Sequence, residues 1–354
     1  MSAKQTAGAR ARSRAHKTWS AFGEELRRRP SEYEILTHNM LHTTGARATV
    51  LDIPRERPLE MGPDVRVNRW YKQHRDSMAL RVDDWDGFRD PDTLTYFSYV
   101  ALQDEQEIYV DGLLEHFDGE GYNEALSEEA LTLLKRALTP TIYVANSQQM
   151  LSSYVQQLAL STYVGNCAVF QTADQLRRVQ LQAYRTTQLR LTYPDRGFGT
   201  GEKTDWTEHP DWQPIRAAFE CALVEFDWDR AFVATNLVTK AIADQLFLVR
   251  LGHQLAQLDA QLDAQILDNL WRDAQRSRRW TTALVEFLRS ADEDNLAVLQ
   301  RPLDEWNERA QLAIDAGARL IATPAGDDAA TIAAAVREDW SGWLGSLGLR
   351  AGRP

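Results

Sequence analysis

Residues 171–178 read Gln-Thr-Ala-Asp-Gln-Leu-Arg-Arg and lie within a helical pattern that ends at about Leu191. About one hundred residues later, residues 271–279 read Trp-Arg-Asp-Ala-Gln-Arg-Ser-Arg-Arg. In both segments an acid or amide is followed by Arg three positions later, so the two side chains share one helix face. The pairs are Asp174/Arg177 and Gln175/Arg178, then Asp273/Arg276 and Gln275/Arg278.

A bundle made from two related helix pairs would place these two segments opposite one another. A buried Arg needs a carboxylate partner, so the segments predict an internal Asp–Arg network. The alternative is two ordinary amphipathic helices that carry their charges on the surface. The sequence leaves both interpretations open.

The periodicity of the rest of the chain favours helices throughout. Gly (19) and Pro (12) are scarce for 354 residues, and no series of strands is visible. Asp90-Pro91-Asp92 is a helix start signal, and Ser127 is a candidate N-cap. Helical patterns are expected at about 140–163, 165–191, 213–226, 229–257, 259–289 and 296–321, with residues 193–212 as the main interruption. The sequence therefore predicts an all-α, long-helix bundle.

The N-terminal segment differs from the rest in charge. Residues 1–30 hold eight Lys or Arg and two Asp or Glu, whereas the whole chain has a formal charge of −11. We expect residues 1–60 to form a basic, partly extended arm, residues 61–321 a helical domain, and residues 322–354 a C-terminal tail that docks through Trp340 and Trp343. Aromatic and Arg side chains together are typical of interfaces. The candidate subunit contacts are Trp19, Phe22, Arg27, Arg28, Arg29 and Tyr33.

Composition excludes several classes of protein. An acidic chain is not typical of a general nucleic-acid binder. No run of about 18 apolar residues predicts a membrane span, and the basic start lacks the apolar segment of a secretory signal. The two cysteines, Cys167 and Cys221, exclude a disulfide framework and are expected to be buried thiols. These features favour a cytoplasmic protein.

Long-helix bundles often hold a di-iron site that needs two Glu-x-x-His pairs. None of the seven His residues has Glu or Asp three positions before it, so no metal, cofactor or catalytic residue is assigned to this chain. Glu107, Asp111 and Glu115 form a row along one helix face that ends beside His116. A solvated or partner-facing stripe is the preferred interpretation of this row, and a metal or acid–base site is the alternative.

Several longer stretches are specific enough to suggest a family. They are Lys-Thr-Trp-Ser at 17–20, Arg-Arg-Arg-Pro-Ser-Glu-Tyr-Glu at 27–34, Asp-Asp-Trp-Asp-Gly-Phe-Arg-Asp-Pro-Asp at 83–92, Leu-Gln-Asp-Glu-Gln-Glu at 102–107, Tyr-Pro-Asp-Arg-Gly-Phe-Gly at 193–199, Asn-Leu-Val-Thr-Lys at 236–240 and Arg-Arg-Trp at 278–280. The chain resembles the β (small) subunit of the hydroxylase of bacterial multicomponent di-iron monooxygenases, in the toluene/o-xylene and isoprene/alkene branch.

The resemblance implies a ferritin-like fold and a non-catalytic, structural role. It implies a di-iron centre in a catalytic α subunit, a small γ subunit and an (αβγ)2 assembly. It further implies a coupling protein, a Rieske ferredoxin and an NADH reductase, in a system that hydroxylates aromatic hydrocarbons or epoxidises alkenes with O2. In that frame the Asp174/Arg177 and 273–278 segments stand where the catalytic relative has its two Glu-x-x-His pairs, and Gln149 stands near a lost Glu.

Two other functions remain open at this point. One is a stand-alone ferritin-like scaffold or interaction protein. The other is a metal enzyme that uses the Glu107/Asp111/Glu115 row. A partner chain that carries two Glu-x-x-His motifs would decide for the monooxygenase subunit.

Overall fold

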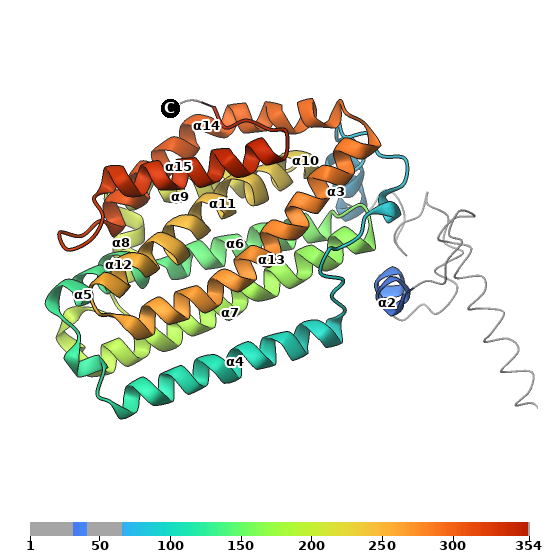
Figure 1. The fold of residues 1–354 in the computed structure, drawn as a ribbon. Helices are drawn as coiled ribbons and strands as arrows, with labels where there is room; N and C mark the ends of the chain where they lie inside the picture. Colours follow the sequence, from blue (N-terminus) through green and yellow to red (C-terminus); the bar gives the residue numbers. More distant parts are fainter. Residues whose placement is uncertain (1–30, 41–65, 353–354) are drawn as a thin grey trace, which may run out of the picture.

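The computed structural model describes residues 31–40 and 66–352, and every regular element within these ranges is a helix. The predicted all-α long-helix bundle is therefore confirmed. Four long helices form its centre: α6 (Thr141–Gln157), α7 (Thr162–Thr192), the helix from α10 to α12, and α13 (Gln261–Ala291). Figure 1 shows α6, α7 and α13 running side by side along the molecule.

The third central helix runs without a break from Trp228 to Gln257. It consists of α10 (Trp228–Phe232), α11 (Lys240–Asp244) and α12 (Leu251–Gln257), joined by π-helical turns at Val233–Thr239 and Gln245–Arg250. Of the helices that the structure describes, this one is long and apolar enough to cross a membrane. However, 89% of its apolar window is buried inside the protein, as in the core helix of a soluble domain.

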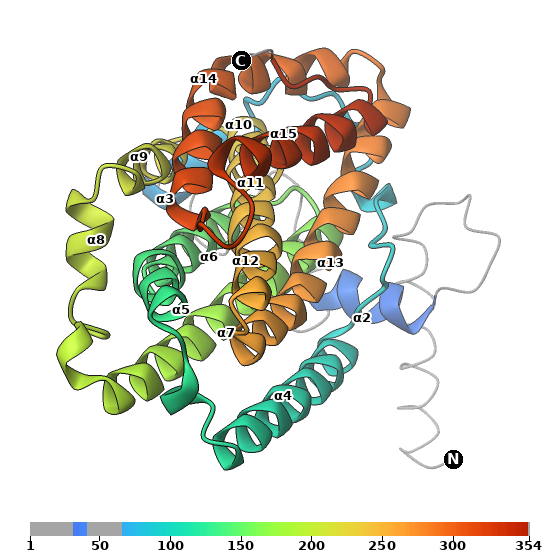
Figure 2. The same cartoon turned by 60° about the vertical axis from the view of Figure 1, so that its left-hand side comes forward.

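Further helices surround this centre. They are α2 (Glu32–Met40), α3 (Arg66–His74), α4 (Tyr96–Gly119), α5 (Glu128–Leu133), α8 (Glu202–Glu208), α9 (Trp212–Ala222), α14 (Asn295–Ile321) and α15 (Ala329–Ser346). In Figures 1 and 2, α4 lies along the outer edge of the bundle beside α7 and α13, while α14 and α15 cover the opposite side. The helix α4 thus has the bundle on only one of its sides.

Local sequence signals explain where several helices begin. Thr95 caps α4 in a capping box with Ser98, and the carboxylate of Asp90 accepts from the backbone N–H groups of Asp92 and Leu94 just before it. Ser127 caps α5 as predicted, since its hydroxyl accepts from the N–H of Ala130.

Two helix boundaries differ from the sequence prediction. The break between the two central helices lies at residues 158–161, where Ser161 caps α7, and Gly165 lies inside that helix. A glycine in the first turn costs a helix little when the cap before it is strong, so Gly165 is a poor breaker. The interruption at 193–212 contains the short helix α8 as well as turns, and Gly197 and Gly199 there have positive φ angles of 76° and 77°.

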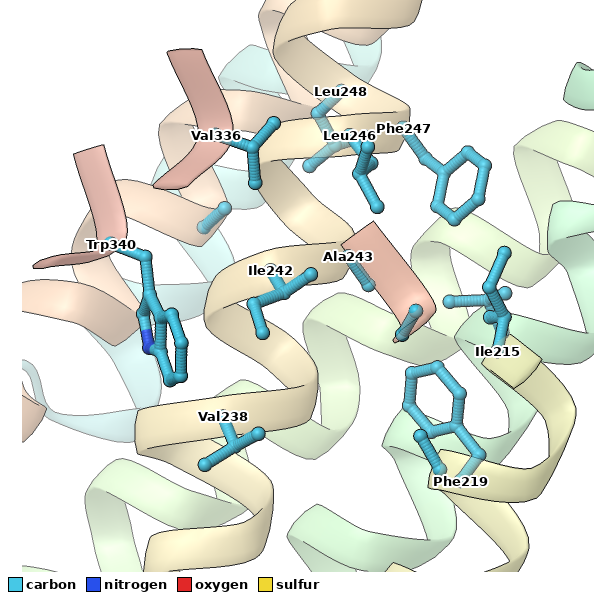
Figure 3. Packing of buried hydrophobic residues seen from close by; sticks show 14 of the residues in the cluster. Ile215, Phe219, Val238, Ile242, Ala243, Leu246, Phe247, Leu248, Val336 and Trp340 are labelled. Carbon is cyan, nitrogen blue, oxygen red and sulfur yellow. The ribbon is translucent and has the colours of Figure 1, made fainter. Parts of the chain in front are cut away.

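The C-terminal segment is part of the core rather than a separate tail. Its helix α15 buries Trp340, which is 1% exposed and donates from Nε1 to the carbonyl of Leu237 at 2.7 Å. Figure 3 shows Trp340 and Val336 of α15 beside Val238 and Ile242, with α9 on the other side of that central helix. The expected docking of Trp340 and Trp343 therefore occurs within this chain.

We predict that W340A lowers the free energy of unfolding by about 3–5 kcal/mol, because it removes a buried aromatic side chain and a hydrogen bond to the central helix. The measurement is chemical denaturation monitored by circular dichroism. The control is E338A, which changes an exposed residue of the same helix and should stay within about 0.5 kcal/mol. Equal losses for the two variants would mean that α15 does not support the fold.

Candidate functional site

The segments 171–178 and 271–279 face each other inside the bundle. Arg177 of α7 donates from Nη1 to Oδ2 of Asp273 in α13 at 2.9 Å. Arg276 of α13 donates from Nη2 to Oδ1 of Asp174 in α7, and to Oδ1 of Asp273 at 3.2 Å. The two ion pairs therefore cross between antiparallel helices, each helix supplying one acid and one arginine. All four residues are at most 7% exposed, so the predicted internal Asp–Arg network is confirmed.

The outer helix α4 completes this network. The Tyr99 hydroxyl donates to Asp174 Oδ1 at 2.9 Å, and the Gln103 amide donates to Asp174 and Asp273 at 3.1 and 2.9 Å. Arg177 Nε also donates to the carboxylate of Glu107. These three α4 residues lie about one helical turn apart, so one face of α4 meets the charged seam between α7 and α13.

Burial sets the electrostatics of the network. Desolvation, together with the charge of Asp273, raises the pKa of Asp174 from 3.8 to about 7. Burial alone would lower the pKa of Arg276, but Asp174 and Asp273 outweigh it and raise that pKa. Oδ2 of Asp174 is buried and has no hydrogen-bond partner among the described residues.

A second ion pair joins α7 to α13 nearer the C-terminal end of α7. Arg185 donates in a bidentate way to Asp263, at 2.7 and 3.1 Å, and also donates to Asn123 at 2.6 Å. The hydroxyl of Tyr122 donates to the same carboxylate at 2.9 Å. Since Tyr122 and Asn123 belong to the loop after α4, both ends of α4 are tied to the same two helices.

Farther from α4, a polar layer joins all four central helices. The Gln171 amide of α7 donates to Ser152 of α6 at 2.9 Å, and its oxygen accepts from Asn236 and from Trp280 of α13, both at 3.1 Å. Asn236 also donates to Thr281 at 2.9 Å. The side chain of Gln149, proposed to stand near a lost Glu, donates to Ser153 in its own helix and is half-buried, whereas Gln148 is fully buried.

The carboxylates between α7 and α13 are paired with arginines and are not arranged around a metal site. Among the residues that the structure describes, no group of three or more His, Cys, Asp or Glu side chains is placed to hold a metal ion. Of the row on α4, Glu107 pairs with Arg177, while Asp111 and Glu115 are exposed. His116 lies near Glu120, at 3.9 Å. The geometry thus serves to hold helices together and offers no reactive pair.

The remaining predicted site residues lie elsewhere. Trp19, Phe22, Arg27, Arg28 and Arg29 fall outside the described residues. Tyr33 is 6% exposed within this chain, its hydroxyl accepts from the N–H of Asp90 at 3.2 Å, and its ring packs on Tyr163. Its role in a subunit contact stays a prediction.

The two predicted thiols differ in their surroundings. Cys167 is 4% exposed, and burial raises the pKa of its thiol well above the ordinary value. Cys221 is only partly buried, where full burial was expected, because it lies on the outward side of α9.

One surface feature was missed by the sequence argument. The outward side of α4 exposes Phe97 (75%), Ile108 (65%), Tyr96 (64%) and Val100 (45%). Because α4 packs on the bundle by one face only, these apolar side chains are not covered by the residues that the structure describes. The signal was present in Phe97 and Ile108, which are apolar residues at positions that do not share the face of Tyr99 and Gln103.

Comparison with known proteins gives consistent results. The profile of the methane/phenol/alkene hydroxylase family matches residues 70–292. The chain is 37% identical over 300 residues to the hydroxylase component subunit beta of the toluene-4-monooxygenase system of Ectopseudomonas mendocina, which covers 85% of this chain and 89% of the relative.

Solved structures agree in fold. A structure of toluene 4-monooxygenase with toluene bound in the resting active site matches with a TM-score of 0.77 and 35% identity, over 85% of this chain and 97% of the other. A crystal structure of phenol hydroxylase from Pseudomonas sp. OX1 matches with a TM-score of 0.75 and 21% identity, over 91% of this chain and 92% of the other, which bears on the fold alone.

We predict that D174N changes how stability depends on pH. Because the folded-state pKa of Asp174 is raised from 3.8 to about 7, the folded chain holds one more proton there between these values than the unfolded chain. The resulting stabilisation is complete below the lower value and is lost as the pH rises through the upper one. Relative to D174N, the wild type should therefore lose up to about 1.4 kcal/mol per pH unit between pH 5 and 7.

The measurement is the free energy of unfolding from denaturant titrations at a series of pH values. D174N keeps an acceptor for Arg276 at the Oδ1 position and places an amide nitrogen at the Oδ2 position, which gives the variant an offset that does not depend on pH. The slope of stability against pH is therefore the quantity to compare. D111N, at an exposed position of α4, is the control. Parallel curves for wild type and D174N would contradict the raised pKa.

Proposed function

The chain belongs to the methane/phenol/alkene hydroxylase family, and we propose that it is the non-catalytic β subunit of the hydroxylase of a multicomponent di-iron monooxygenase. The observation that carries the proposal is the crossed pairing of Asp174 and Asp273 with Arg276 and Arg177. Carboxylates in the middle of the bundle are committed to arginines, so they fasten helices and bind no metal. In this proposal the chain holds no cofactor.

The chemistry belongs to the assembly rather than to this chain. The di-iron centre would lie in the catalytic α subunit and would supply O2 activation for the hydroxylation of an aromatic hydrocarbon or the epoxidation of an alkene. The names of the relatives at 35% and 37% identity, both toluene-4-monooxygenase, support the aromatic class. Electrons would come from NADH through a reductase and a Rieske ferredoxin, with a coupling protein on the hydroxylase. The system would be cytoplasmic, without nucleic-acid or membrane partners.

The assembly would be an (αβγ)2 complex with a small γ subunit. We assign the outward face of α4 to contact with the catalytic α subunit. A surface that gathers Phe97, Ile108, Tyr96 and Val100 on one helix is typical of an interface, and family membership supplies the partner. The exposed acids between them, among them Asp104 and Asp111, favour a partner surface that is apolar with basic residues around it.

The basic arm would extend the same contact. Residues 1–30 carry a net charge of +6, and Trp19, Phe22 and Arg27–Arg29 remain the proposed anchors on a neighbouring subunit. The first described helix after them, α2, is held by its own chain, because Glu34 pairs with Arg89 at 3.0 Å and Tyr33 is buried. The arm would therefore leave the domain from a fixed point.

We predict that native mass spectrometry of the complex purified from its source, with iron measured on the separated chains, finds two copies of this chain and iron only on a larger partner. The reason is that the acids inside this bundle are already paired with arginines. A lone chain that carries stoichiometric metal would contradict the proposal and would point back to the Glu107 row.

We predict that F97D and I108D each weaken assembly with the catalytic subunit by roughly tenfold or more, since each places a charge in a desolvated contact. Co-purification and size-exclusion chromatography of the complex measure the effect. L312D is the matched control, because Leu312 is a 53% exposed residue of α14, away from α4. If all three variants assemble like the wild type, the α4 face is not the contact.

A further inference from the structure

A cluster of buried charges on the side of α7 away from α4 is not neutral. Arg178 of α7 donates from Nη1 to Oδ1 of Asp244 at 3.2 Å, and Lys240 pairs with the other oxygen of the same carboxylate. The three side chains are 2%, 5% and 4% exposed, respectively. Two buried cations therefore share one carboxylate, which leaves one positive charge without a partner among the described residues.

The neighbouring donors are also unsatisfied. Nε and Nη2 of Arg178 have no hydrogen-bond partner in the part of the chain that the structure describes, and neither has the hydroxyl of Ser277. The bonds Gln171–Ser152 and Gln182–Thr141 set the antiparallel register of α6 and α7. That register places the amide of Gln148, which has no partner among the described residues either, one turn from Arg178.

The crossed network beside α4 does not neutralise this charge. Its acids bond to Arg177 and Arg276, and no hydrogen bond or ion pair joins Asp174 or Asp273 to Arg178 or Lys240 in the described ranges. Buried donors and charges are rarely left without acceptors, so the cluster requires an ion or water.

Space for such a species lies beside Lys240. A cavity of about 20 Å3 is lined by Lys240, Asp244, Asn236, Ser277 and Arg278, with Trp343 at its side. That is room for one particle of about the size of a water molecule, so phosphate and sulfate are too large. Arg278 pairs with Asp339 at 2.8 Å and lies over the Trp343 ring, so the charge of this lining residue is already compensated.

We propose that this cavity binds one small monovalent inorganic anion of the halide class, held by the ammonium group of Lys240 and the hydroxyl of Ser277 and attracted by the nearby Arg178. The anion neutralises the unpaired charge, and the surrounding cations exclude a metal ion. This site is separate from the α4 contact and from any iron chemistry, and it does not depend on the proposed function.

The direct test is anomalous diffraction from crystals of the hydroxylase, with the partner subunits that it carries, grown with bromide in place of chloride. The expected result is one bromine peak in the cavity, in contact with Lys240 Nζ. Electron density there without a bromine signal means that the cavity holds water, and this result overturns the proposal.

A second test measures hydrogen exchange in peptides of this chain while it is part of the complex. Amide hydrogen exchange of the 236–250 segment should slow in chloride relative to gluconate, which does not fit the cavity, at equal ionic strength. K240M leaves the neutral Arg178–Asp244 pair and should abolish both the chloride effect and the bromide peak. The matched control is K135M, which breaks the Lys135–Asp205 pair at 2.7 Å on another part of the molecule and should retain both.

The wild-type results test the anion site even if K240M fails to fold. An exchange rate that does not respond to chloride, with no bromine peak, overturns the anion site. A bromine peak that persists in folded K240M overturns the assignment to Lys240.

Discussion

The crossed ion pairs between α7 and α13 are the constraint on which the rest of the molecule depends. Each buried acid accepts from an arginine of the other helix, so the sliding of either helix by one turn would leave buried charges unpaired. An uncompensated buried charge costs about 3–5 kcal/mol, a large share of the stability of a domain. An apolar seam could be equally stable, but it would tolerate many registers, whereas these pairs permit one.

That register in turn positions the outer helix. The face of α4 that bears Tyr99, Gln103 and Glu107 bonds to charges brought together by α7 and α13, and Tyr122 and Asn123 repeat the arrangement at the far end. The same helix also buries the apolar side chains of Val110 and Leu114 against the bundle. Other apolar side chains of α4, among them Phe97 and Ile108, remain exposed.

The sequence predicted the elements that depend on neighbours along the chain. The i, i+3 spacing of Asp174/Arg177 and Asp273/Arg276 indicated a shared network, and caps such as Ser127 indicated helix starts. It did not predict contacts chosen by the packing of distant helices. The adjacent residues Gln148 and Gln149 differ only in which of them faces the bundle, and Asp244 has no local feature that marks it as the partner of Arg178. Similarly, the Ala- and Gly-rich composition of α15 hid a helix whose burial depends on Trp340 meeting Leu237, about one hundred residues earlier.

The bundle is polar at its centre, although its described residues form no cluster that could hold a metal ion. Four helices that meet at Gln171 and Asn236 have donors and acceptors in fixed directions, and each bond is satisfied in one arrangement only. A subunit whose role is to hold a catalytic neighbour in place needs a unique shape more than it needs maximal stability. Directional bonds supply uniqueness, whereas apolar contacts of similar volume are interchangeable. In this chain, therefore, side chains of the types that bind metals or catalyse reactions in other bundles hold the helices in one arrangement. The cluster of Lys240 and Arg178 is the exception, because one of its charges stays unpaired unless an ion binds there.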